Sequence, residues 1–237
     1  MSWDTEIDEL KRRIELAHHM GGPEKIKRQH DAGRLTVRER IDAILDTDSF
    51  HEIGAISGKS QYSEDGKLQS FRPSNCIFGR GRIDDRNVVL VGDDFTVRGG
   101  AADASIHEKQ IAAEQMAYEL HLPVIRLVEG TGGGGSVKSL ESDGYTYVPG
   151  NPGWDWVVAN MGQVPVVSLA LGPVAGLGAA RVATSHYALM VKGQSQMFVA
   201  GPPVVARIGE NVTKILPDEV IQLLGGCIAC DAAVTLG

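Results

Sequence analysis

Two glycine-rich segments are places where the backbone itself could do chemistry. Residues 130–135 follow the hydrophobic stretch 123–129, and residues 172–178 follow the stretch 164–171. Glycine loses much conformational freedom on folding, so such clusters mark positions where a Cβ atom would be in the way. Exposed backbone N–H groups there can bind a phosphate or a developing oxyanion. A flexible or tight turn, or close packing of a helix on a strand, explains the same glycines without a ligand.

The first glycine segment does not fit the standard nucleotide-binding patterns. Gly130, Gly132 and Gly135 match G-x-G-x-x-G formally, but almost any run of glycines does. A dinucleotide-binding fold would need a helix next, and residues 136–150 carry no helical period. A P-loop would need glycine before Lys138, and Val137 stands there. We therefore expect at most an anion-binding loop of another kind.

The second glycine segment has a clearer geometry. Gly172, Gly176 and Gly178 end a predicted strand and open a predicted helix, which directs free N–H groups and a positive dipole outward. That arrangement suits an oxyanion. No G-x-S-x-G or H-E-x-x-H pattern accompanies it, and the seven histidines are scattered. Glu129 is the acid nearest to the glycines, and we interpret it as a structural anchor rather than a catalytic group.

Composition and charge limit the other possibilities. The chain has 237 residues, of which 43% are hydrophobic, enough for one large domain or two small ones. Its 23 basic and 30 acidic residues give a net charge of −7, which argues against nucleic acid as a partner. The sequence has no run of about 18 apolar residues, so no membrane span is expected. The acidic, polar N-terminal segment does not read as a signal peptide, and we expect a cytoplasmic protein.

Cysteine usage agrees with a reducing compartment. The three cysteines are Cys76, Cys227 and Cys230, too few for a disulfide framework. Cys227 and Cys230 form a C-x-x-C pair without a second ligand pair nearby. We interpret them as ordinary thiols and expect no metal.

The first fifty residues are predicted to be helical. Hydrophobic periodicity and glycine stops give helices over 4–20, 22–33 and 35–45. In the third helix, Thr36 and Glu39 have the spacing of a capping box. We interpret its charged residues as a solvated face. The polar segment 57–70 is expected to be a loop or the tip of a hairpin.

From Cys76 onward, strands and helices alternate, which indicates α/β layers. Sites in such folds gather at the carboxyl ends of the strands, where both glycine segments lie. The expected strands cover 76–83, 87–94, 123–129, 164–172 and 187–193, and the expected helices cover 102–120, 154–162 and 179–185.

Four long blocks resemble the carboxyltransferase (β) subunits of biotin-dependent acyl-CoA carboxylases, the group of propionyl-CoA and acetyl-CoA carboxylases. The blocks are residues 21–54, 93–109, 171–180 and 190–205, in the order that the family has them. The resemblance implies a crotonase-like (Clp/crotonase) ββα superhelix preceded by a helical segment. On this basis we expect an N-terminal helical extension over 1–50 and a crotonase-like carboxyltransferase domain over 51–237.

The resemblance also implies a reaction. Family members transfer CO₂ from N1′-carboxybiotin to the α-carbon of an acyl-CoA, with the oxyanion held by backbone amides and the proton removed by biotin. Gly176 and Leu177 match the pair that binds the thioester oxygen, although Leu177 stands where the family usually has glycine. Residues expected to bind the substrate are Arg98, Gly99, Gly100, Gly132, Gly133, Gly134 and Gly135. For the CoA phosphates we expect the basic residues nearest to strand ends or loops, which are Arg80, Arg82, Arg98 and Lys59. The family usually has an aromatic residue in place of Arg98. Where residues 132–135 stand, most family members have a Ser-Gly-Gly-Ala-Arg segment, and its arginine is missing here.

The resemblance covers only the first of two halves. In the family this half binds the acyl-CoA, and the second half binds biotin. Expected partners are therefore a carboxyltransferase C-terminal half and a biotin carboxylase or biotin carrier subunit, within a homo- or hetero-oligomer. The segment 132–135, the helix after Gly178 and the apolar segment 199–208 are expected to border the interface. This half is not expected to bind biotin alone.

Other functions stay open beside the carboxylase reading. One is a biotin-dependent acyl-CoA decarboxylase or transcarboxylase, and another is a non-catalytic CoA-binding half of a larger complex. A hydratase would need acids near both glycine segments. A Clp-type serine protease would need a nucleophilic serine where Gly176 stands.

Overall fold

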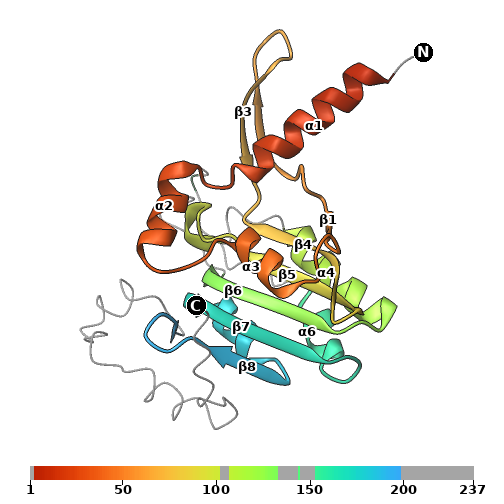
Figure 1. The fold of residues 1–237 in the computed structure, drawn as a ribbon, viewed down its shortest axis with the longest axis vertical. Helices are drawn as coiled ribbons and strands as arrows, with labels where there is room; N and C mark the ends of the chain where they lie inside the picture. Colours follow the sequence, from red (N-terminus) through yellow and green to blue (C-terminus); the bar gives the residue numbers. More distant parts are fainter. Residues whose placement is uncertain (1–2, 102–106, 133–143, 145–152, 199–237) are drawn as a thin grey trace.

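The computed structural model describes residues 3–101, 107–132, 144 and 153–198, and Figure 1 shows their arrangement. The chain begins with three helices: α1 (Asp4–His18), α2 (Pro23–Asp31) and α3 (Val37–Ile44). The predicted capping box is confirmed at α3. The Thr36 hydroxyl accepts a hydrogen bond from the Glu39 N–H, and the Glu39 carboxylate accepts one from the Thr36 N–H, at 2.7 Å.

A seven-stranded sheet forms the centre of the molecule. Its order is β1-β4-β5-β6-β7-β8, and β9 also pairs with β7. Pairing is antiparallel from β1 to β5 and parallel from β5 onward. The strands are β1 (His51–Ile53), β4 (Cys76–Ile83), β5 (Arg86–Asp93), β6 (Val124–Gly132), β7 (Val166–Gly176), β8 (Tyr187–Met190) and β9 (Gln196–Phe198).

The segment 57–70, expected to be a loop or the tip of a hairpin, lies in a separate two-stranded hairpin whose turn covers residues 63–67. The hairpin consists of β2 (Gly58–Tyr62) and β3 (Leu68–Pro73). In Figure 1 this hairpin projects from the body beside α1.

Side chains from alternate positions of β5 fill the core on both faces of the sheet, as a strand's period of two requires. Val89 and Val91 pack in one cluster with Ala113 and Ala117 of α4 (His107–Leu120). The other face carries Val88 and Leu90. The other helices in the described ranges are α6 (Trp154–Asn160), α7 (Leu177–Ala183) and the short 3₁₀ helix η1 (Arg98–Gly100).

Helix α3 covers the face of the sheet that carries Val88 and Leu90. Its buried Val37 and Ile41 belong to one cluster with Leu90 of β5 and Leu127 of β6. The helical segment and the sheet thus share a hydrophobic core across the expected boundary at residue 50.

Two predicted strand ends are wrong. We expected strands to stop at residues 129 and 172, but β6 continues to Gly132 and β7 to Gly176. The reason is pairing: Gly130 to Gly132 lie opposite Val174 to Gly176, and β9 adds its pairing on the other side of β7. Sheet hydrogen bonds with both neighbours therefore extend β7 through glycines that sequence patterns assign to a turn.

Candidate functional site

The two glycine segments meet at the carboxyl ends of β6 and β7. Gly132 and Gly176 are direct Cα partners in this parallel pair. Gly176 ends β7 with φ 60° and ψ −126° and is the N-cap of α7. Residues other than glycine rarely adopt this backbone conformation. The sharp change from strand to helix at Gly176 is therefore a specific requirement for glycine.

This turn places amide donors at the edge of the sheet. The first N–H groups of a helix have no acceptor within the helix, and Leu177 is the first residue of α7. The helix dipole adds partial positive charge at the same point. Gly176 and Leu177 therefore lie at the junction of β7 and α7, and their role as oxyanion donors stays a prediction.

A third segment, η1, lies against the same edge. Arg98, Gly99 and Gly100 all have positive φ angles, of 54°, 62° and 69°. A Cβ atom on Gly100 would lie 2.6 Å from the Glu129 carbonyl oxygen, and one on Gly130 would lie 2.8 Å from the Gly100 Cα. The backbones of η1 and β6 can approach this closely only because both positions are glycine. The fold therefore brings Arg98, Gly99 and Gly100 to the edge where Gly132, Gly176 and Leu177 lie.

Glu129 sits beneath these glycines, and its side chain is 1% exposed. Its carboxylate accepts hydrogen bonds of 2.9 and 2.8 Å from the Gln29 amide and forms ion pairs with Arg34 at 3.1 Å and Arg40 at 2.5 Å. Burial raises the pKa of Glu129, and the charge of Arg40 and the bond from Gln29 oppose that shift. The interpretation of Glu129 as an anchor is confirmed, because its oxygens tie α2 and α3 to the strand.

The same carboxylate explains Gly172. A Cβ atom there would lie 2.3 Å from the Glu129 Oε1, so the glycine leaves room for the buried carboxylate. It does not make a turn, contrary to the expectation from sequence.

Two further carboxylates lie at the end of β5, and both are engaged. Asp93 forms an ion pair with Arg181 of α7 at 3.5 Å and accepts a bond from the Glu129 N–H at 3.4 Å. Asp94 accepts bonds from the Thr96 N–H at 2.9 Å and hydroxyl at 2.6 Å. Burial raises the pKa of both acids, and these partners oppose it. In the described part of this edge, each of the three carboxylates has structural partners.

Arg126 holds α7 from the opposite end. Its guanidinium group is fully buried and pairs with Glu114 of α4 at 2.7 and 2.9 Å. It also donates to the carbonyl oxygens of Arg181 at 3.1 Å and Thr184 at 2.6 Å, where α7 ends. Asn160 of α6 donates to the same Glu114 carboxylate. This network sets the position of the helix whose first residue is Leu177.

Sequence reasoning did not identify the buried arginines of the site. Arg40 was assigned to a solvated helix face, and that assignment is wrong, since Arg40 is 6% exposed and pairs with Glu129. The hydrophobic residues of α3 point to the sheet, but the partner of Arg40 is 89 positions away in sequence. Arg126 sits inside a hydrophobic strand, which is the one local sign that it needs a buried counter-charge.

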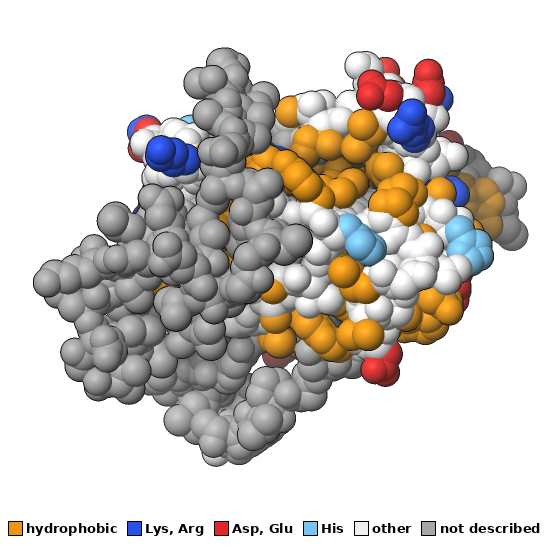
Figure 2. Space-filling view, turned by 90° about the horizontal axis from the view of Figure 1, so that it is seen from below, with side chains coloured by type: hydrophobic (Ala, Val, Ile, Leu, Met, Phe, Trp, Pro, Cys, Tyr) orange, Lys and Arg blue, Asp and Glu red, His pale blue; other side chains and the backbone are white. Residues whose placement is uncertain are grey.

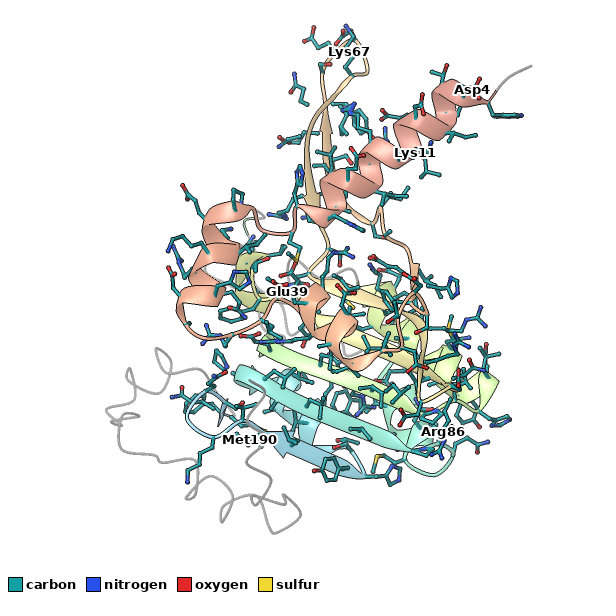
Figure 3. The ribbon with its side chains drawn as sticks, in the orientation of Figure 1. Asp4, Lys11, Glu39, Lys67, Arg86 and Met190 are labelled. Carbon is teal, nitrogen blue, oxygen red and sulfur yellow. The ribbon has the colours of Figure 1, made fainter. Side chains whose placement is uncertain are left out.

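Arg80 and Arg82 are not brought to the glycine edge. They lie on β4, opposite Val89 and Asn87 of β5, near the end of β5 that Arg86 marks in Figure 3. There they line a hollow of about 300 Å³ together with His51 and Asp48. Lys59 lies in the projecting hairpin. The role of these three cations toward CoA stays a prediction.

Several other expectations fall outside the described residues or concern absences. Gly133, Gly134, Gly135, Cys227, Cys230 and the segment 199–208 lie outside the described part of the chain. Within that part, no group of histidine, cysteine and acidic side chains could hold a metal ion. Nor is any described helix long and apolar enough to cross a membrane.

The described residues form an α/β protein in which two glycine segments meet at the carboxyl edge of a parallel sheet. Residues 28–224 match the model of the carboxyl transferase domain. The chain belongs to the carboxyl transferase domain family.

Named relatives agree with this assignment. The chain is 32% identical over 216 residues to the propionyl-CoA carboxylase carboxyltransferase subunit of Haloferax mediterranei, covering 90% of this chain and 40% of the relative. It is 30% identical over 207 residues to a putative propionyl-CoA carboxylase beta chain of Bacillus subtilis, covering 87% and 39%. The chain thus spans about 40% of the length of these relatives.

Solved structures share the fold. Transcarboxylase 12S, solved with methylmalonyl-coenzyme A and methylmalonic acid, superposes with a TM-score of 0.72 at 24% identity, covering 98% of this chain and 45% of the other. A single-chain, multi-domain long-chain acyl-CoA carboxylase gives 0.74 at 23% identity, covering 95% and 23%. The expected crotonase-like α/β fold is confirmed by this similarity.

Proposed function

We propose that this chain is the acyl-CoA-binding half of a carboxyltransferase, which adds CO₂ to the α-carbon of a short-chain acyl-CoA. The observation that carries the proposal is the pairing of Gly132 with Gly176 beside the first residue of α7. Backbone donors fixed in this way can stabilise the negative charge that develops on a thioester oxygen. The family to which residues 28–224 belong, and the carboxylase subunits among its relatives, support the same reaction class.

In the proposed reaction the α C–H bond breaks and a new C–C bond to CO₂ forms. As the proton leaves, charge moves to the thioester oxygen, and the N–H groups of Gly176 and Leu177 hold it. Carboxybiotin, when bound, supplies the CO₂ and the nitrogen that takes the proton. The described residues fit a reaction in which biotin, rather than a side chain, takes the proton. The carboxylates of Asp93, Asp94 and Glu129 are all engaged in structural contacts.

We place the biotin site on a second carboxyltransferase half. The chain spans about 40% of the length of its relatives, which leaves room for such a half. A biotin carboxylase or biotin carrier subunit would then deliver the carboxyl group within an oligomer in the cytoplasm. A decarboxylase or transcarboxylase would use the same edge with the carboxyl group moving in the other direction.

A proline at position 177 tests the oxyanion role. Proline is tolerated at the first position of a helix but has no N–H, so Leu177→Pro deletes one donor with little damage to α7. Leu177→Ala keeps the N–H and is the matched control. With a purified family C-terminal half and carboxylated carrier, we expect Leu177→Pro to lower kcat for carboxylation of propionyl-CoA by about 100-fold.

Near-normal turnover of Leu177→Pro, with Leu177→Ala also active, would remove the oxyanion role of this turn. Binding of propionyl-CoA without carboxylation by the unmodified chain and any tested half would favour the non-catalytic CoA-binding alternative. Biotin-dependent loss of CO₂ from methylmalonyl-CoA, without the forward reaction, would favour a decarboxylase.

A further inference from the structure

Helix α1 carries a hydrophobic stripe with the spacing of a coiled coil. Trp3, Ile7, Leu10, Ile14 and Ala17 are separated by alternate steps of four and three residues. This 3.5-residue repeat places all five side chains along one side of the helix. In heptad notation Trp3 and Leu10 occupy d positions, and Ile7 and Ile14 occupy a positions.

Among the described residues, the stripe is covered only at its C-terminal end. Ala17 is buried in the body, whereas Leu10 is 46%, Ile7 45% and Trp3 68% exposed. Figure 1 shows why: α1 leaves the body at its C-terminal end and projects away from the sheet. Large apolar side chains repeated along an exposed helix mark a surface that binds a partner.

The β2–β3 hairpin stiffens this projecting helix from one side. Arg13 of α1 donates to the Tyr62 hydroxyl at 3.0 Å and lies over the Tyr62 ring. Arg13 also pairs with Glu9 at 2.8 Å. The helix and the hairpin thus form a projecting arm, visible at the top of Figure 3.

Charge along α1 changes sign from one half to the other. Residues 4–9 contain the acids Asp4, Glu6, Asp8 and Glu9 and no base. Residues 10–15 contain Lys11, Arg12 and Arg13 and one acid. Such a helix is complementary to a second copy of itself running in the opposite direction.

We propose that α1 is a dimerisation element that pairs antiparallel with α1 of a second copy of this chain. In antiparallel pairs, a residues meet d residues. Ile7 then packs on Leu10 of the second copy, and Trp3 packs on Ile14, which gives four layers related by a two-fold axis. The flanking e positions bring Asp4 next to Lys11 of the second copy, and the g positions bring Glu6 next to Arg13.

The shape of the molecule selects the antiparallel direction. In a parallel pair, the C-terminal ends of both helices would bring the two bodies together near the buried Ala17. In the antiparallel pair the bodies lie at opposite ends of the paired helices. A two-fold pair also uses the same surface on both copies, so no copy of that surface is left free and association through it stops at the dimer.

The pairing is expected to be weak. A helix of 15 residues is about 22 Å long, so the interface is at the small end for a stable dimer. We therefore expect a concentration-dependent dimer, visible by sedimentation equilibrium of the 237-residue chain at tens of micromolar.

Charge exchange at the e positions is the sharpest test. Asp4→Lys puts lysine opposite Lys11, and Lys11→Glu puts glutamate opposite Asp4, so each variant alone should have a Kd raised about 10-fold. An equimolar mixture of the two variants restores opposite charges at both e contacts and should regain the original Kd. Glu24→Lys and Lys25→Glu make the same charge changes at exposed positions of α2, outside the contact, and should leave the Kd unchanged.

A hydrophobic variant and a cross-link complete the test. Leu10→Lys should abolish pairing, whereas Leu35→Lys, at a similarly exposed leucine outside α1, should not. In a background with Cys227→Ser and Cys230→Ser, Trp3→Cys mixed with Ile14→Cys should form a mixed disulfide, and Trp3→Cys alone should not.

Unchanged association of Leu10→Lys, failure of the mixture to regain the Kd, or cross-linking of Trp3→Cys with itself would overturn the proposal. The readouts are mass and cross-linking, so they do not depend on carboxyltransferase activity.

Discussion

At the scale of single residues, the buried carboxylate of Glu129 is the feature on which the site edge depends. It is the shared counter-charge of Arg34 and Arg40, whose side chains are 18% and 6% exposed. Glu129→Gln would leave the guanidinium groups of Arg34 and Arg40 without their shared negative counter-charge. Removing one partner of a buried ion pair costs about 3 kcal/mol or more. We expect urea denaturation to show a loss of that size.

A surface ion pair provides the control for Glu129→Gln. Lys27 and Asp31 of α2 form an exposed i,i+4 pair at 2.7 Å. Exposed pairs contribute less than about 1 kcal/mol, so Asp31→Asn should have a small effect. Equal losses for the two variants would show that Glu129 is not an anchor.

Sequence patterns predicted the glycines of the site better than its charges. Gly176 follows from the local change of strand to helix, and the capping box at Thr36 from a spacing of three residues. Arg40, Gln29 and Arg34 could not be assigned, because their common partner Glu129 is about a hundred positions away. Local patterns contain no information on which buried charge finds which partner.

At the scale of elements, the position of α7 depends on both of its ends. Gly176 sets the start of the helix, and Arg126 binds the carbonyl oxygens at its end while it pairs with Glu114. Hydrophobic alternation predicted β6 and β7, but not their extension to Gly132 and Gly176. That extension comes from hydrogen bonds between strands, which a single strand's sequence does not determine.

Arg126→Lys tests this view of α7. Lysine keeps the charge but cannot pair bidentately with Glu114 while it also reaches two carbonyl groups. We expect amide hydrogen exchange in residues 177–184 to become about tenfold faster, which corresponds to about 1.4 kcal/mol of local stability. Helix α3 serves as the internal reference, and exposed Arg28→Lys as the matched variant. Unchanged exchange in α7 would mean that Gly176 alone positions the helix.

At the scale of the whole molecule, the two proposals assign partners to two separate surfaces of the described residues. One is the projecting arm with Trp3, Ile7 and Leu10. The other is the glycine edge, with Gly132, Gly176 and Leu177. Figure 2 shows groups of hydrophobic side chains on the face seen from below, on the side of α6 and β8. Val158 of α6 is 56% exposed and Tyr187, the first residue of β8, is 43% exposed.

The proposed second half should cover the glycine edge and not the arm. An added C-terminal carboxyltransferase half is expected to slow hydrogen exchange at η1 and at the start of α7, because an acyl-CoA at this edge must reach a carboxyl donor on the other half. Exchange in α1 should stay unchanged, and Leu10→Lys, which disrupts the arm, should bind the added half normally. Protection of α1 by the added half, with η1 unaffected, would show that the arm is the site of the second half. A monomeric chain with full carboxyltransferase activity alone would show that no second half is needed.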